Sequence, residues 1–127
     1  MESIMKIAVS SNDNKGLEST VSEHFGHCPF FTMVTVKENT IQKTEAVGNP
    51  FCQGHQPFEI PNFLKSQGIQ VIITQGMGGR AINFFQENAI QPVTGCRGTV
   101  KDAVEAFLSG KFSQAAPCSE SVAHHHG

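Results

Sequence analysis

Cysteines and histidines are the side chains of this sequence with the clearest capacity for chemistry. The candidates that stand in predicted loops are His24, His27, Cys28, Cys52, His55 and Cys96. Thiolate and imidazole ligands together suit zinc, copper(I) or iron–sulfur species, because soft ligands favour soft or borderline metals. The spacings of the two histidine-containing clusters are compatible with chelation, but they match neither a paired C-x-x-C zinc framework nor the multi-cysteine run of a ferredoxin. The pattern predicts a metal or cluster site with an open ligand set.

Each of these residues also has a plainer interpretation. A free cysteine is commonly a small buried hydrophobic residue, and a single loop histidine is commonly a hydrogen-bonding residue. Further along, Cys118 and the run His124–His126 form either a metal-binding arm or the remnant of an expression tag, and we favour a native tail.

A glycine-rich stretch, Gly76-Met77-Gly78-Gly79-Arg80-Ala81, stands between a predicted strand and a predicted helix and fits the pattern G-x-G-x-x-A. A dinucleotide site also needs an acidic residue at the end of the next strand, where this chain has Thr94-Gly95-Cys96, so we exclude a nicotinamide cofactor. Backbone amides at a helix start attract anions. The predicted anion-binding residues are Gly76, Gly78, Gly79, Arg80 and Arg97. The other interpretation is a tight turn that requires glycine dihedral angles.

Enzyme chemistry is less well supported. Cys96 and His24 have the composition of a nucleophile and base, but nothing in the sequence orients them as a pair. Paired carboxylates for a two-metal nuclease are missing from the predicted strand ends, since Asp13 stands alone in a long loop. The sequence therefore predicts binding rather than catalysis.

The bulk composition excludes several classes of protein. A net charge of −2 with scattered lysines and arginines argues against nucleic-acid binding. No apolar run approaches the length of a membrane span, and the first residues lack a secretory leader, so we expect a cytoplasmic protein with reduced thiols.

The elements that must position these residues follow from hydrophobic periodicity. We expect strands near residues 5–10, 30–37, 40–47, 69–75 and 90–94, and helices near 59–67, 80–88 and 99–109. The order β-β-β-α-β-α-β-α predicts a three-layer α/β fold, with a mixed five-stranded sheet, one antiparallel strand from the hairpin, and helices on both faces. Pro92 places the last strand at a sheet edge, and Thr99 caps the last helix.

This topology gathers the candidate ligands. In α/β sheets, ligands bind outside the carboxyl ends of the parallel strands. The loops that carry His24, Gly76 and Cys96 should open at that end, and the loop with Cys52 enters the helix beside it.

Several of these stretches together resemble the dinitrogenase iron–molybdenum cofactor biosynthesis family over about residues 5–112. The matching stretches are Met5–Val9, Ser22–Gly26, Pro29–Phe31, Asn49-Pro50, Gly76–Ala81 and Gly98–Ala103. The resemblance implies a ribonuclease-H-like sheet without nuclease activity, and binding of iron–sulfur or iron–molybdenum cofactor precursors. It also implies that His24 is the family's characteristic histidine. Where His27 stands an arginine is common, and the additional cysteines favour a cysteine-ligated cluster or a single metal.

We therefore expect one domain over residues 1–112, followed by a flexible tail over 113–127. The predicted function is non-catalytic carriage of an iron–sulfur or iron–molybdenum type cluster or its precursor, with zinc or another single transition metal as a second possibility. The partners would be an unidentified protein donor or acceptor, and the chain would be a monomer or homodimer. The alternative is a small-anion or nucleotide-binding regulatory module that uses Gly76–Arg80.

Overall fold

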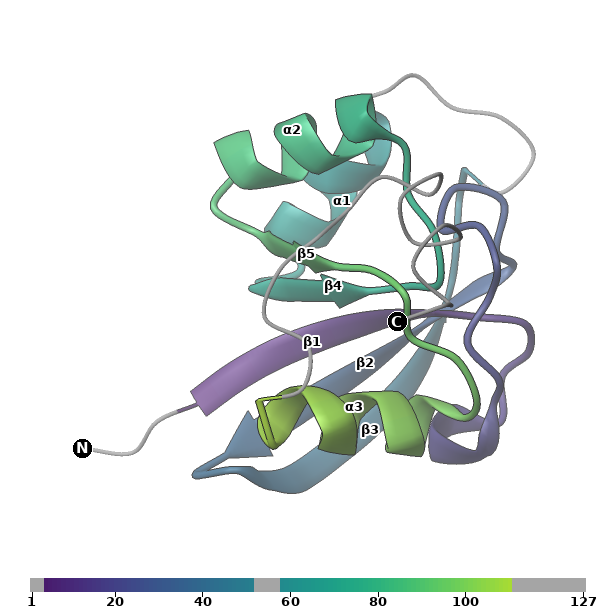
Figure 1. Cartoon of the computed structure of the whole chain (residues 1–127), viewed down its shortest axis with the longest axis vertical. Coiled ribbons are helices and arrows are strands. Elements are labelled where there is room, and N and C mark those ends of the chain that lie inside the picture. The colour runs from purple at the N-terminus through teal and green to yellow at the C-terminus, as the bar shows by residue number, and fades with distance from the viewer. Residues whose placement is uncertain (1–3, 52–57, 111–127) are drawn as a thin grey trace, which may run out of the picture.

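The computed structural model describes residues 4–51 and 58–110, which form a five-stranded sheet with helices on both faces (Figure 1). The elements follow the predicted order, with one short 3-10 helix, η1, added in the first long loop. Their bounds are β1 (Ile4–Ser11), η1 (Gly16–Glu18), β2 (Phe30–Lys37), β3 (Thr40–Gly48), α1 (Glu59–Ser66), β4 (Val71–Ile73), α2 (Gly79–Glu87), β5 (Gln91–Val93) and α3 (Val100–Leu108).

The sheet has the spatial order β3-β2-β1-β4-β5. Strand β2 pairs antiparallel with β1 and β3, whereas β4 is parallel to β1 and β5 is parallel to β4. The hairpin therefore supplies the one antiparallel strand, as predicted. Pro92 lies in the edge strand β5, where its missing N–H costs no ladder hydrogen bond. The three-layer α/β fold is confirmed, and the ribonuclease-H-like label stays a prediction.

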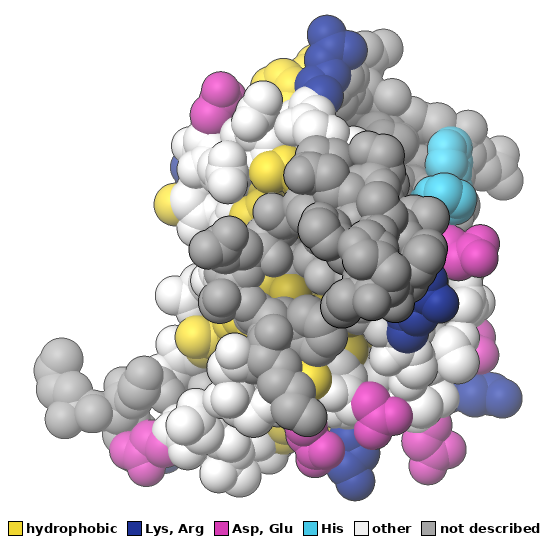
Figure 2. Space-filling view, viewed as in Figure 1, with side chains coloured by type: hydrophobic (Ala, Val, Ile, Leu, Met, Phe, Trp, Pro, Cys, Tyr) yellow, Lys and Arg dark blue, Asp and Glu magenta, His cyan; other side chains and the backbone are white. Residues whose placement is uncertain are grey.

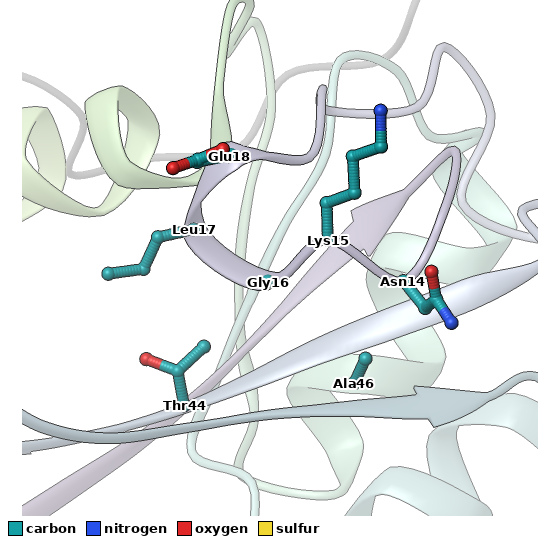
Figure 3. A pocket seen from close by; sticks show the side chains of 7 residues that line it. All are labelled: Asn14, Lys15, Gly16, Leu17, Glu18, Thr44 and Ala46. Carbon is teal, nitrogen blue, oxygen red and sulfur yellow. The ribbon is translucent and has the colours of Figure 1, made fainter.

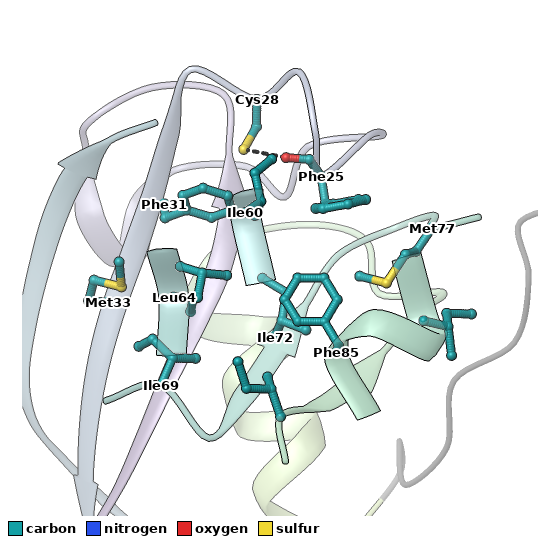
Figure 4. Packing of buried hydrophobic residues seen from close by; sticks show 13 residues of the cluster. Phe25, Cys28, Phe31, Met33, Ile60, Leu64, Ile69, Ile72, Met77 and Phe85 are labelled. Atoms are coloured by element: carbon teal, nitrogen blue, oxygen red, sulfur yellow. Dashed lines mark hydrogen bonds between the residues drawn. The ribbon is translucent and has the colours of Figure 1, made fainter. Parts of the chain in front are cut away.

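Two hydrophobic cores cover the two faces of the sheet. Helices α1 and α2 pack on one face, where Leu64 and Phe85 are fully buried in one hydrophobic cluster with Phe31 (Figure 4). Helix α3 packs on the other face through Val100 and Val104. The central strand β1 serves both cores, because its side chains alternate between the faces. This explains why its sequence is apolar in every buried position up to Val9.

The long loop between β1 and β2 is held by three isolated backbone bridges. Ser11 pairs with Val21, Thr20 with Thr99, and His24 in parallel with Gly76. The Thr99 side chain also caps α3 by accepting a hydrogen bond from the Asp102 amide at 3.1 Å, as predicted. The loop is therefore an organised part of the fold that carries its histidines to the carboxyl ends of the parallel strands.

In the described part of the chain no helix has the length and apolar character that crossing a bilayer requires. The predicted tail over residues 113–127 lies outside the described residues, as do the predicted ligands Cys52 and His55 and the tail residues Cys118 and His124–His126.

Candidate functional site

Two adjoining hollows lie at the carboxyl ends of the parallel strands, and both are lined by His24 and His27. The first, of about 290 Å³, is completed by Phe25, Gly26, Gly76, Met77 and Gly78. The second, of about 230 Å³, is completed by Asn12, Ser22 and Glu23. Both histidines are exposed, and Figure 2 shows histidine side chains at the surface with acidic and basic side chains nearby. We call the first hollow the histidine–glycine cleft.

Residues Thr74 and Gln75, just after β4, bind the loops of the site to one another. The buried Thr74 hydroxyl accepts a hydrogen bond from Ser10 Oγ at 2.8 Å and lies 3.4 Å from the carbonyl oxygen of Ser22. The Gln75 side chain donates to the carbonyl oxygen of Val21 at 3.0 Å, and its own carbonyl accepts from the Gly95 amide at 2.8 Å. All three loops predicted to converge are therefore fastened together at this point.

The glycine wall of the cleft, formed by Gly76 and Gly78, is not a tight turn. Gly78 has a φ of −70° and a ψ of 157°, which any residue can adopt, and Gly79 begins α2 without a positive φ. A Cβ placed on either residue meets no atom within 4 Å. The interpretation that glycine dihedral angles are required here is therefore wrong for these two residues. The missing side chain of Gly78 leaves backbone exposed in the cleft that His24 and His27 line.

Cys28 lies beneath the cleft, in the core under α1 and α2 (Figure 4). Its side chain is 1% exposed, and its Sγ donates a hydrogen bond to the carbonyl oxygen of Phe25 at 3.0 Å. The thiol therefore stabilises the loop from within, and in this conformation it does not line the cleft that its neighbour His27 lines.

Cys96 lies on the other face of the sheet, fully buried in the core beneath α3. The loop after β5 folds back on β4, where the Cys96 amide donates to the carbonyl oxygen of Thr74 at 3.3 Å. Burial raises the pKa of the Cys96 thiol to about 12. Since the thiolate is the species that ligates metals, the buried thiol is a poor ligand in this conformation.

The structure thus brings together part of the predicted ligand set. His24 and His27 meet the glycine loop, whereas Cys28 and Cys96 lie in two different cores. Within residues 4–51 and 58–110, no group of three or more His, Cys, Asp or Glu side chains is arranged to hold a metal ion. Cys52 and His55 stay predictions.

The predicted anion-binding arginines lie outside the walls of both hollows. Arg80 is exposed in the first turn of α2, whose N-terminus has no side-chain cap, and Arg97 is exposed after Cys96. Neither lines the cleft.

A wider hollow of about 460 Å³ lies elsewhere, between η1 and β3 (Figure 3). Its walls include Lys15, Glu18 and Thr44, and none of the predicted ligands lines it. Size alone therefore does not locate the candidate site.

Several residues of the site were not predicted from the sequence as site residues. Met77 and Phe25 line the cleft, and Ser22 and Glu23 line its neighbour. Only their positions in the sequence could have indicated them: Ser22, Glu23 and Phe25 stand within two residues of His24, and Met77 stands inside the glycine loop. Asn49, which holds the loop of His27, was visible only as part of the Asn49-Pro50 stretch.

Comparison with known proteins agrees with this fold. An uncharacterized protein, MJ0580, from Methanocaldococcus jannaschii is 25% identical over 113 residues, which cover 87% of this chain and 92% of that protein. The crystal structure of PH0822 shares 34% identity with a TM-score of 0.76, covering 87% of this chain and 96% of that one. The apo form of the orange protein (ORP) from Desulfovibrio gigas shares 27% identity with a TM-score of 0.77, covering 89% and 94%.

The family model described as "Dinitrogenase iron-molybdenum cofactor" matches residues 4–110, which include β1, the histidine loop, the glycine loop and α3. Fold, motifs and relatives therefore agree, and the chain belongs to the dinitrogenase iron–molybdenum cofactor family.

Proposed function

We propose that this protein carries an iron–sulfur or iron–molybdenum type cluster, or a precursor of one, as cargo in the histidine–glycine cleft, without catalysing a reaction on it. Membership of the dinitrogenase iron–molybdenum cofactor family supports the class of cargo. The position of the cleft supports the site, because it lies outside the carboxyl ends of parallel strands, where α/β sheets bind ligands.

The observation that carries the proposal is that two exposed imidazoles share a cleft with the glycine loop, in which Gly76 and Gly78 present backbone without a side chain. His24 and His27 can each offer a nitrogen to a metal, and imidazole is a suitable ligand for iron. Opposite them, Gly78 leaves room for a ligand, since the space a Cβ would occupy is empty. The N-terminus of α2 directly after Gly78 has no side-chain cap, so its first amides favour an anionic cargo.

The described thiols fit this cargo poorly as they stand. Cys28 and Cys96 are buried in separate cores, and burial raises the pKa of the Cys96 thiol. We propose that any thiolate ligand comes from Cys52, with His55 as a further imidazole. A site with few protein ligands and an open rim suits a protein that must also give up its cargo to a partner.

Anaerobic reconstitution with ferrous iron and sulfide tests the proposal. The wild-type protein should acquire visible absorption and bound iron, and the combined change His24→Ala and His27→Ala should reduce the bound iron several-fold. The change Lys43→Ala, on the exposed face of β3, is the control and should leave bound iron unchanged. Wild-type protein that stays colourless and free of iron would contradict cluster carriage.

Two further results would redirect the proposal. If zinc binds tightly while iron with sulfide does not, the cargo is a single metal. If inorganic phosphate raises the melting temperature and Arg80→Ala abolishes that effect while the histidine variant does not, the chain is the anion-binding module that the glycine loop predicted.

A further inference from the structure

The buried side chain of Asn49 joins the end of β3 to the loop that carries His27. Its Nδ2 donates hydrogen bonds to the carbonyl oxygens of Cys28 at 2.9 Å and Gly26 at 3.3 Å. Its Oδ1 accepts from the amide of Phe51 at 2.9 Å. The side chain is 6% exposed, so water does not compete well for these groups. The two carbonyls that it holds belong to the residues on either side of His27.

The chemistry of this position requires a carboxamide. One end of the side chain must donate to two carbonyl oxygens, while the other end must accept from an amide. An aspartate has the same shape, but its carboxylate only accepts and would face two carbonyl oxygens in a buried site. The Asn49 backbone amide also donates a hydrogen bond, to the carbonyl oxygen of Pro29 at 2.9 Å. One residue thus holds the loop on both sides of His27.

We propose that Asn49 is the positioning residue for His27 in the histidine–glycine cleft. His27 stands between Gly26 and Cys28, whose carbonyl oxygens the Asn49 side chain holds, so Asn49 fixes the main chain from which the exposed His27 residue lines the cleft. Asn49 also fixes Phe51, the residue directly before the predicted ligand Cys52. The same carboxamide therefore links the histidine loop to the main chain at Phe51. The role in cargo binding rests on the proposed function.

Four proteins test this inference: the wild type, Asn49→Asp, Asn49→Ala and the control Asn88→Asp. Asn88 is a matched control because its Nδ2 also donates to a carbonyl, that of Phe84 at 2.8 Å, at the far end of α2 from the cleft. Bound iron is measured after anaerobic reconstitution. In protein without iron, NMR follows the ring signals of His27 and the hydrogen exchange of the amides of residues 49 and 51.

We expect Asn49→Asp to shift the His27 ring signals and to speed exchange of the residue 49 amide about tenfold or more, while the Phe51 amide, whose acceptor is retained, changes less. A tenfold change corresponds to about 1.4 kcal/mol. Bound iron should fall several-fold in both Asn49 variants and stay near wild type in Asn88→Asp.

The outcomes separate the two proposals. If the His27 signals and bound iron are unchanged while Asn49→Asp loses only thermal stability, Asn49 is merely structural and the inference is overturned. If the His27 signals shift but wild-type protein binds no iron, positioning of His27 stands and cluster carriage fails. If wild type and Asn49→Asp bind iron equally although His27 has moved, cluster carriage stands and the positioning role in binding fails.

Discussion

The backbone of His24 pairs with that of Gly76 in a parallel bridge, although 52 positions separate the two residues in the chain. The same two residues line one hollow. The main chain of the histidine loop and that of the glycine loop are therefore held side by side by backbone pairing. Substitutions of the exposed lining residues His24, His27 and Gly78 can therefore be interpreted as changes of the site, whereas Phe25 and Met77 also belong to the core.

Filling the glycine wall should separate stability from binding. Gly78→Ser supplies a side-chain cap to α2, and serine is better than glycine at this position by a few tenths of a kcal/mol, so urea denaturation should show equal or slightly higher stability. Gly78 lines the cleft, so a serine side chain at this position should take space from the cargo, and the iron retained after reconstitution should fall. Gly79→Ala is the control: it lies outside the cleft lining and should keep wild-type retention. Equal iron retention in the wild type and both variants would show that Gly78 is not part of the cargo site.

The buried hydroxyl pair of Ser10 and Thr74 should behave as a coupled unit. Thr74→Val leaves Ser10 Oγ without its acceptor in a fully buried position, which costs about 1–3 kcal/mol of unfolding free energy. Adding Ser10→Ala removes the stranded group and should recover part of that loss. Urea denaturation of the two single variants and the double variant measures the coupling, and strictly additive losses would show that the two hydroxyls do not depend on each other.

Alkaline pH should destabilise the protein through Cys96. The folded-state pKa of this thiol is about 12, above the ordinary value of 9.0 that applies when the chain is unfolded. Stability from the protonated buried thiol is therefore present in full below pH 9 and is lost as pH rises toward 12, by about 1.4 kcal/mol per pH unit. Denaturation of wild type and Cys96→Ala at pH 7, 9 and 10.5 checks this. The wild type should lose its advantage as pH rises, and parallel pH profiles would show that the thiol ionises in the folded state.

Thiol labelling at pH 7 should distinguish the cysteines by burial. Cys28 and Cys96 are each at most 1% exposed, so iodoacetamide should modify them only when the chain opens, at least tenfold more slowly than in urea-unfolded protein. Peptide mapping by mass spectrometry after timed labelling gives the rate for each cysteine. Rapid labelling of Cys96 in the folded protein would revive the interpretation of a cysteine-dependent enzyme.

The elements of the fold could be predicted because their signals are local. The apolar run around Ile72 and the helical spacing of Val100, Ala103 and Val104 each report burial within a few residues. The strand order could be narrowed because parallel strands joined by helices follow few topologies. The edge position of β5 was predicted correctly because proline lacks a backbone N–H, and this property of Pro92 can be recognised from the sequence alone.

The convergence of His24 with the glycine loop was also predictable, since it follows from topology. The burial of the Cys28 and Cys96 thiols could not be predicted, because it depends on which face of the sheet each loop turns toward. Cys96 enters a core because its loop folds back to bond Thr74. The glycine motif misled in a similar way: its letters fit a turn, while the start of α2 gives Gly78 an ordinary extended backbone.

The three isolated bridges of the first long loop determine the stage of synthesis at which the cleft can form. They connect residue 11 to 21, 24 to 76, and 20 to 99. During synthesis, a chain that has not yet reached residue 76 has no second wall for the cleft, and one that has not reached residue 99 lacks the bridge to Thr20. The cleft is therefore complete only late in synthesis, and a chain that ends before residue 76 lacks the wall that faces the histidine loop.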